Sequence, residues 1–88
     1  MTKKEIKNWK NKLKTLSEQE KQIMYAFFQV YQMFEMLDNI QDIFGIYDES
    51  EYNDLINQGQ WCIKELAEVK GIEEQEAKEI IYQFLDIK

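Results

Sequence analysis

The residues best suited to chemistry in this chain are carboxylates grouped around one tryptophan. Six polar or aromatic residues recur at i, i+3, i+7, i+10, i+14 and i+17, which places them on one arc of an α-helix: Glu51, Asp54, Gln58, Trp61, Glu65 and Glu68. Tryptophan is a large anchor for a protein interface, and flanking carboxylates attract a basic partner. We therefore expect a partner-binding site at Glu51, Asp54, Trp61, Glu65 and Glu68. The alternative is that Trp61 packs against the N-terminal helix or a second copy, while the acids are only solvated.

The composition argues against catalytic and metal-binding roles. The chain has no His, no Arg and a single Cys, Cys62. Zinc sites need several Cys or His ligands, and catalytic triads usually use His as the base. The acidic run at residues 48–54 does not fit a calcium loop, because Gly45 precedes the acids instead of following them. We predict that the protein is not an enzyme and holds no cofactor and no metal ion.

Charge is divided unevenly along the chain. Residues 1–14 hold six lysines and one glutamate, for +5, whereas residues 15–88 hold five lysines and sixteen acids, for −11. An acidic body repels nucleic-acid phosphates and favours a basic protein partner, so direct nucleic-acid binding is not expected. The charge could also serve only to keep a small protein in solution. We expect the basic N-terminal segment to dock on the body through Ile6, Trp9 and Leu13, with a membrane surface or a phosphate backbone as alternative targets.

The helices that position these residues are marked in the sequence by start and stop signals. There is no Pro, there are three Gly, and the apolar residues follow long 3.6-residue periodicities. The signals are N-caps at Thr2, Ser17 and Asp48, each with Glu three residues later, and closing glycines at Gly45 and Gly71. They predict helices at about 3–14, 18–44 and 49–70 and a fourth after Gly71. We predict an all-α bundle of about four helices in a single domain over residues 1–88, with a basic N-terminal helix (3–14) and an acidic body (17–88).

The long helix is more apolar than one core contact requires. Fifteen of the twenty-two residues from Ile23 to Phe44 are apolar. The predicted core comprises Trp9, Phe27, Phe34, Leu37, Phe44, Leu55, Cys62, Leu66, Ile80 and Phe84, and the seam on the long helix is widened by Met33, Met36, Ile40 and Ile43. Met24, Phe28 and Tyr31 fall on the opposite arc. Three such residues in one patch imply a second contact, made by the N-terminal helix folding back, by a second copy in a homodimer, or by another partner.

Residues 63–81, IKELAEVKGIEEQEAKEII, resemble a helix-turn-helix corner. Small and apolar residues stand at Ala67, Gly71, Ile72 and Ile80, as that motif requires. The second helix departs from a DNA-reading helix because it has only one cation, Lys78. Its four carboxylates would repel the phosphates of DNA: Glu73, Glu74, Glu76 and Glu79. We expect this corner to be a scaffold that does not bind DNA.

Three functions remain open from the sequence. The first is an acidic inhibitor or adaptor that engages a basic, nucleic-acid-binding protein, as phage anti-defence and DNA-mimic proteins do. The second is a helical immunity protein that neutralises a toxin or bacteriocin. The third is a small regulator that uses the helix-turn-helix-like corner. The lone Cys, the lack of a secretory signal and the lack of a membrane-length apolar run favour a cytoplasmic location. All cationic residues are lysine, a bias that is typical of proteins encoded by AT-rich genomes, such as those of many bacteria and their phages.

Overall fold

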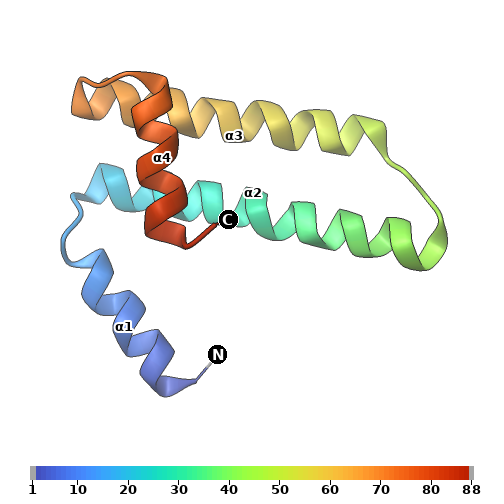
Figure 1. The fold of residues 1–88 in the computed structure, drawn as a ribbon, viewed down its shortest axis with the longest axis horizontal. Helices are drawn as coiled ribbons and strands as arrows, with labels where there is room; N and C mark the ends of the chain where they lie inside the picture. Colours follow the sequence, from blue (N-terminus) through green and yellow to red (C-terminus); the bar gives the residue numbers. More distant parts are fainter. Residues whose placement is uncertain (1, 88) are drawn as a thin grey trace.

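The computed structural model describes residues 2–87, which form four α-helices and no strand (Figure 1). The helices are α1 (Lys3–Leu13), α2 (Glu18–Phe44), α3 (Glu49–Lys70) and α4 (Glu74–Leu85). The prediction of an all-α, four-helix bundle with one long helix over residues 18–44 is confirmed.

Side-chain caps start three of the helices where the sequence predicts. The hydroxyl oxygen of Ser17 accepts a hydrogen bond from the backbone N–H of Glu20, and the Glu20 carboxylate accepts one from the backbone N–H of Ser17. This reciprocal pair is a complete capping box for α2. The side chains of Thr2 and Asp48 accept from the N–H three residues further on and cap α1 and α3. The helix boundaries are therefore set by local chemistry.

Glycine ends the two longest helices. Gly45 and Gly71 close α2 and α3 with φ angles of +67° and +66°, in the left-handed region that other residues rarely adopt. No atom lies within 4 Å of the place where a Cβ would stand on either residue. The need for glycine at these turns is therefore a matter of backbone conformation and not of space.

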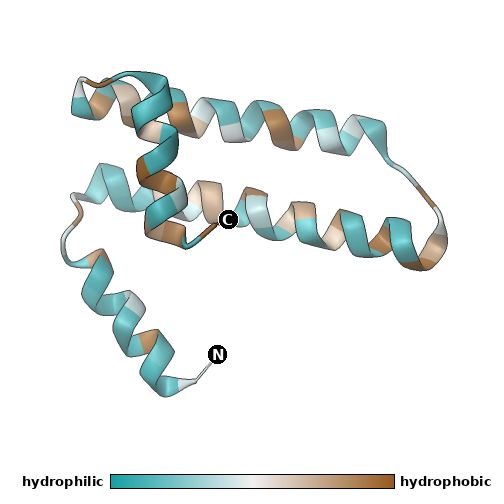
Figure 2. Cartoon of the chain, in the orientation of Figure 1, coloured by the Kyte–Doolittle hydropathy of each residue, from teal (hydrophilic) through white to brown (hydrophobic). Residues whose placement is uncertain are grey.

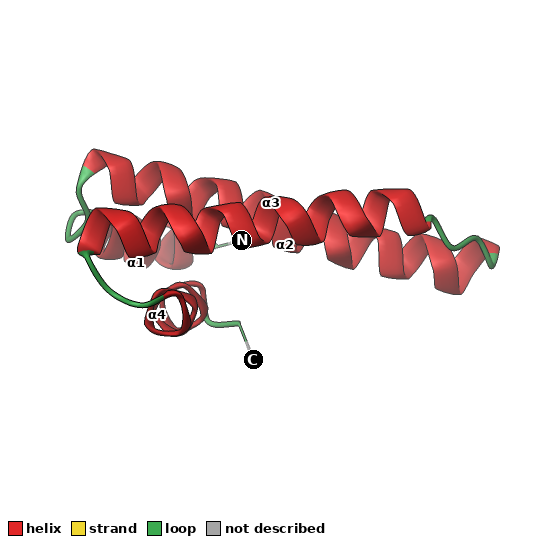
Figure 3. Cartoon of the chain, turned by 90° about the horizontal axis from the view of Figure 1, so that it is seen from above, coloured by secondary structure: helices red, strands yellow, loops and turns green. Residues whose placement is uncertain are grey.

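The long helices α2 and α3 run antiparallel as a hairpin, and the other two helices cover only part of it (Figure 1). α4 crosses one face of the hairpin near the start of α2, and α1 lies beside that same end (Figures 1 and 3). No helix of residues 2–87 covers the opposite face, which we call the open face (Figure 3). The fold is correspondingly flat, with principal extents of 41 × 34 × 20 Å.

The buried apolar residues form two clusters. The proximal core joins α2, α3 and α4 and consists of Ile23, Met24, Phe27, Cys62, Leu66, Ala67, Ala77 and Ile81. The distal core joins only α2 and α3 and consists of Val30, Leu37 and Leu55, with Phe34, Ile40 and Tyr52 packed against it. The distal half of the hairpin is thus held by fewer contacts than the proximal half.

Most of the predicted core is correct, and one residue is wrong. Five predicted residues are buried, namely Phe27, Leu37, Leu55, Cys62 and Leu66. Four more are half-buried, namely Trp9, Phe34, Ile80 and Phe84. Phe44, by contrast, is 68 % exposed. The 27 residues of α2 extend about 40 Å, whereas the 12 residues of α4 extend about 18 Å, so α4 cannot reach the end of α2 where Phe44 lies.

The helix α1 docks through its tryptophan. The Trp9 ring lies 6.4 Å from that of Phe28 and 5.9 Å from that of Phe84, measured between centroids. Lys12 Nζ donates a hydrogen bond to the backbone carbonyl of Phe84 at 2.9 Å and lies 4.7 Å from the centre of the Trp9 ring. The predicted docking of the basic helix is confirmed at Trp9, while Ile6 is exposed.

Candidate functional site

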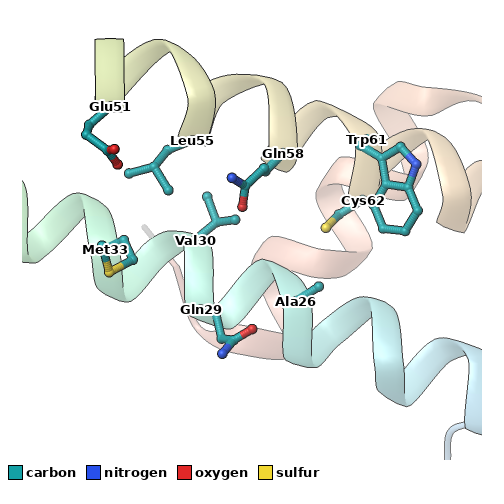
Figure 4. A pocket seen from close by; sticks show the side chains of 9 residues that line it. All are labelled: Ala26, Gln29, Val30, Met33, Glu51, Leu55, Gln58, Trp61 and Cys62. Carbon is teal, nitrogen blue, oxygen red and sulfur yellow. The ribbon is translucent and has the colours of Figure 1, made fainter. Parts of the chain in front are cut away.

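The acidic stripe of α3 lies along the open face, with its tryptophan in water. Trp61 is 56 % exposed. Its ring projects from α3 toward α2 (Figure 4). Of the four predicted acids, Glu51, Asp54 and Glu68 are exposed and Glu65 is half-buried. The structure thus places the whole stripe on one accessible surface, and Trp61 packs on neither α1 nor α4.

Two hollows flank Trp61 and together form a groove between α2 and α3. The larger has a volume of about 530 Å³ and is lined by Ala26, Gln29, Val30, Met33, Glu51, Leu55, Gln58, Trp61 and Cys62 (Figure 4). The smaller, of about 290 Å³, is lined by Gln19, Gln22, Ile23, Ala26, Trp61, Glu65 and Val69. Both hollows share Ala26 and Trp61, and neither has a lining residue from α1 or α4. We call this surface the α2–α3 groove.

The floor of the α2–α3 groove is apolar and chemically inert. Val30, Leu55 and Cys62 are all buried at its base. Burial raises the pKa of the Cys62 thiol, which keeps the side chain neutral at physiological pH. Cys62 therefore contributes apolar surface to the groove and does not supply a nucleophile.

The electrostatic field around the groove is anionic. Between residues 22 and 63 the chain has no lysine, and it has seven acidic residues. Glu51 lines the larger hollow and Glu65 the smaller, while Asp54 and Glu68 stand on α3 outside both. Such a surface attracts cationic ligands and repels phosphates.

A stripe of exposed apolar side chains extends the groove along the distal half of α2. Its exposed members are Met33, Met36 and Ile43, while Ile40 between them is half-buried against the distal core, as predicted. Met36 is 52 % exposed and Ile43 is 73 % exposed, so the prediction that the stripe widens the core is wrong for these residues. Figure 2 shows hydrophobic colouring continuing to the end of α2 and into the loop after it. The available sequence signal is the excess of apolar residues in this helix.

The three residues predicted to form one oligomer contact lie in three different places. Met24 is 2 % exposed in the proximal core, so it cannot contact a second copy. Phe28 is half-buried and lies against Trp9 of α1. Tyr31 lines a separate hollow on the side of α4, and a hydrogen bond to Glu35 raises its pKa. Of the alternatives weighed for this patch, the docking of α1 accounts for Phe28, whereas Met24 is enclosed in the proximal core.

The helix-turn-helix-like corner has its acids on the outside. α4 turns across the hairpin after Gly71 and places Ala77 and Ile81 in the proximal core (Figure 1). Glu76 and Glu79 remain exposed on its outer surface. These carboxylates repel phosphates, so the surface is poorly suited to nucleic acid.

Other kinds of site find no support within residues 2–87. No helix there combines the length and the apolar content needed to cross a membrane. Nowhere in that range do three or more His, Cys, Asp or Glu side chains come together to hold a metal ion. Comparisons with protein families, with curated proteins and with solved structures find no match to this chain. The fold and the open face therefore define it only as an all-α bundle with an acidic groove.

Proposed function

We propose that this protein is a binding module for a basic protein, and that it occupies the surface with which that partner binds nucleic acid. The observation that carries the proposal is Trp61, which is 56 % exposed beside an apolar groove on a helix face of carboxylates. An aromatic anchor within a polar rim is the usual composition of a binding hot spot. In this role the protein is an inhibitor or adaptor, as DNA-mimic and phage anti-defence proteins are.

The two parts of the site act at different stages of binding. The carboxylates of α3 attract a cationic surface over a distance that salt limits to about 8 Å near physiological ionic strength. Trp61 acts at contact, because covering its ring removes a large apolar area from water. With the module bound, its carboxylates pair with the Lys and Arg side chains that otherwise hold phosphates. Nucleic acid is then excluded from the partner.

The test measures binding rates with the partner that the protein captures from its own cells after nuclease treatment. Changing Glu51, Asp54, Glu65 and Glu68 to Lys is expected to slow association, and added salt should reproduce the effect. Trp61→Ala is expected to speed dissociation and to weaken binding by about 2 kcal/mol or more, which is about 30-fold.

Matched control variants show whether the effects on binding are specific to the open face or follow from overall charge and aromatic content. Changing Glu35, Asp42, Glu76 and Glu79 to Lys alters the net charge equally but leaves α3 unchanged, so association should be affected less. Tyr25→Ala removes an exposed ring that lines neither hollow of the groove, so it should speed dissociation much less than Trp61→Ala. A partner whose affinity ignores both salt and Trp61 would exclude this face.

Competition with duplex DNA addresses the choice of partner. The proposal requires that DNA and this protein exclude each other from the partner. A gel shift in which this protein itself retains DNA, and loses it steeply with salt, would instead favour the helix-turn-helix-like regulator. A toxin partner that binds no nucleic acid would favour the immunity protein.

A further inference from the structure

The two rims of the α2–α3 groove differ in charge. The rim on α2 is formed by Gln22, Gln29 and Met33, and no charged residue occurs anywhere between residues 22 and 34. The rim on α3 carries Glu51 in one hollow and Glu65 in the other. A ligand lying along the groove therefore meets an apolar floor, a neutral wall on one side and an anionic wall on the other.

The apolar surface is long and narrow. From Ala26 in the groove to Ile43 at the end of the stripe, α2 extends about 25 Å at 1.5 Å per residue. The exposed side chains along it include Met33 and Met36, whose flexible thioethers adapt to different apolar partners. These dimensions match one face of a helix of about 18 residues.

We propose that the partner binds through a basic amphipathic α-helix that lies along the α2–α3 groove. The apolar side chains of this helix contact Met33, Met36 and Ile43, and its lysines or arginines stand on the one flank that faces α3. This inference rests on the proposed function, because it names the element by which the basic partner docks. A third helix packed on an antiparallel pair completes a bundle, and laying an amphipathic helix into a groove is a common recognition mode.

Charge complementarity selects this occupant over the others. An anionic membrane or a nucleic acid would be repelled by a hairpin with seven acids and no lysine between residues 22 and 63. A second copy that stacked its own hairpin on this one would bring the same acids. The basic helix α1 of a second copy has its tryptophan already packed on Phe28 and Phe84. A cationic helix from a different protein meets neither obstacle.

The asymmetry of the rims predicts the direction of the bound helix. A helix with cations on one flank can point them at α3 in only one chain direction. Moving the same cations to the other flank reverses the direction that satisfies Glu51 and Glu65. Binding by general electrostatic attraction alone would show no such reversal.

The probes are two synthetic peptides of about 18 residues. Each has leucines at helical spacing, lysines on one flank and glutamines on the other, and the two differ only in which flank is basic. The protein is labelled with ¹³C at the methionine methyl groups. Both peptides should shift the NMR signals of Met33 and Met36 and leave that of Met24 unchanged, because Met24 is buried in the proximal core. Raising the salt from about 50 mM to about 300 mM should weaken binding about tenfold.

A nitroxide at the N-terminus of each peptide reports the direction of binding. A second sample, labelled with ¹³C at the isoleucine and valine methyl groups, is used for this measurement. If one peptide broadens the methyl signals of Ile43, the other should broaden those of Val69, at the opposite end of the open face. Equal broadening of both ends by both peptides would overturn the inference. Methionine signals that move with the concentration of protein alone would also overturn it, because they would show a second copy in the groove.

Variants separate this inference from the proposed function. Met36→Glu should weaken both peptides at least tenfold, whereas Met36→Leu and the charge-matched Asn53→Glu, on the exposed outer side of α3, should not. The helical circular dichroism of all three should match that of the unmodified chain, because both positions are exposed. If the captured partner depends on Trp61 but is indifferent to Met36→Glu, the helix inference fails and the proposed function stands. If the partner is indifferent to Trp61 as well, both fail.

Discussion

The proximal and distal halves of α2, residues 18–30 and 31–44, have similar apolar content but different surroundings. In the proximal half, α4 covers one face and Leu66, Ala77 and Ile81 have no exposed surface at all. In the distal half, α2 and α3 have only each other, and Ile43 and Phe44 lie mostly in water. Two paired helices can bury only the stripe where they meet. A similar density of apolar residues along α2 therefore builds a core at one end of this helix and an exposed surface at the other.

This difference locates the functional surface. Exposed apolar side chains in a continuous row do not stabilise the isolated chain and are typical of interaction sites. In this protein the row continues from the groove beside Trp61, so the distal stripe and the acidic face belong to one surface. Four measurements test this difference between the two halves.

The largest expected effect is on stability, in the proximal core. Leu66→Ala should lower the free energy of unfolding by an amount near the upper end of about 2–5 kcal/mol, because Leu66 is fully enclosed and its neighbours come from three helices. Leu37→Ala should cost an amount near the lower end, because the distal core can collapse and admit water. Urea denaturation of both variants provides the test. Equal costs would show that the two halves are equally well packed.

The helices and their ends can be predicted from the sequence because their signals are local. The capping box at Ser17 and the left-handed Gly45 depend only on neighbouring residues. The exposure of the acidic stripe likewise follows from periodicity along α3. These parts of the fold and of the candidate site required no knowledge of which helices meet.

The incorrect predictions concern residues whose burial depends on which part of α2 another helix covers. Periodicity shows that Phe44 shares a face with the core, but not that α4 ends before it. In the same way, Met24 and Tyr31 share an arc of α2, yet α1 approaches the first and α4 approaches the second. For the same reason, the sequence does not distinguish the exposed stripe from a core seam, since its residues are apolar and spaced as in a core. The apolar pattern of one helix does not specify which part of that helix a neighbouring helix covers.

The second prediction concerns Gly59, which lies between the two cores. A Cβ added to this helical residue would meet Phe27 Cε2 at 3.7 Å and Val30 Cγ1 at 3.8 Å, which are ordinary contacts. Gly59→Ala should therefore stabilise the protein by about 0.5–1 kcal/mol, because alanine loses less backbone entropy in a helix. Gly71→Ala is the control and should destabilise, since its φ is +66°. Thermal unfolding measures both, and a destabilised Gly59→Ala would mean that the hairpin is packed more tightly there than these distances indicate.

The third prediction is an effect of pH confined to the distal half. The Tyr52 hydroxyl donates a hydrogen bond to Asp38 at 2.6 Å, and this bond raises the pKa of Tyr52 to about 12 from its usual 10.0. Because the folded state favours the neutral phenol, the resulting stability is complete below pH 10 and is lost as the pH rises from 10 to about 12. An ultraviolet titration should show one tyrosine ionising last, and Tyr52→Phe should remove that step. A titration unchanged by Tyr52→Phe would show that the hydrogen bond is absent in solution.

The smallest expected effect is at Phe44, and its smallness decides between two descriptions of the distal end. If Phe44 belonged to the core, its replacement by glutamine would cost several kcal/mol, as large-to-small and apolar-to-polar changes in cores do. Because the side chain is 68 % exposed, we expect Phe44→Gln to change the free energy of unfolding by less than about 0.5 kcal/mol. Urea denaturation at low and high protein concentration measures this directly. A loss above about 1 kcal/mol that is independent of concentration would place Phe44 inside the fold, and one that appears only at high concentration would mean that a second copy covers it. A neutral result would leave Phe44 beside the stripe as surface that contributes nothing to the folded chain alone, which is the property that a docking surface requires.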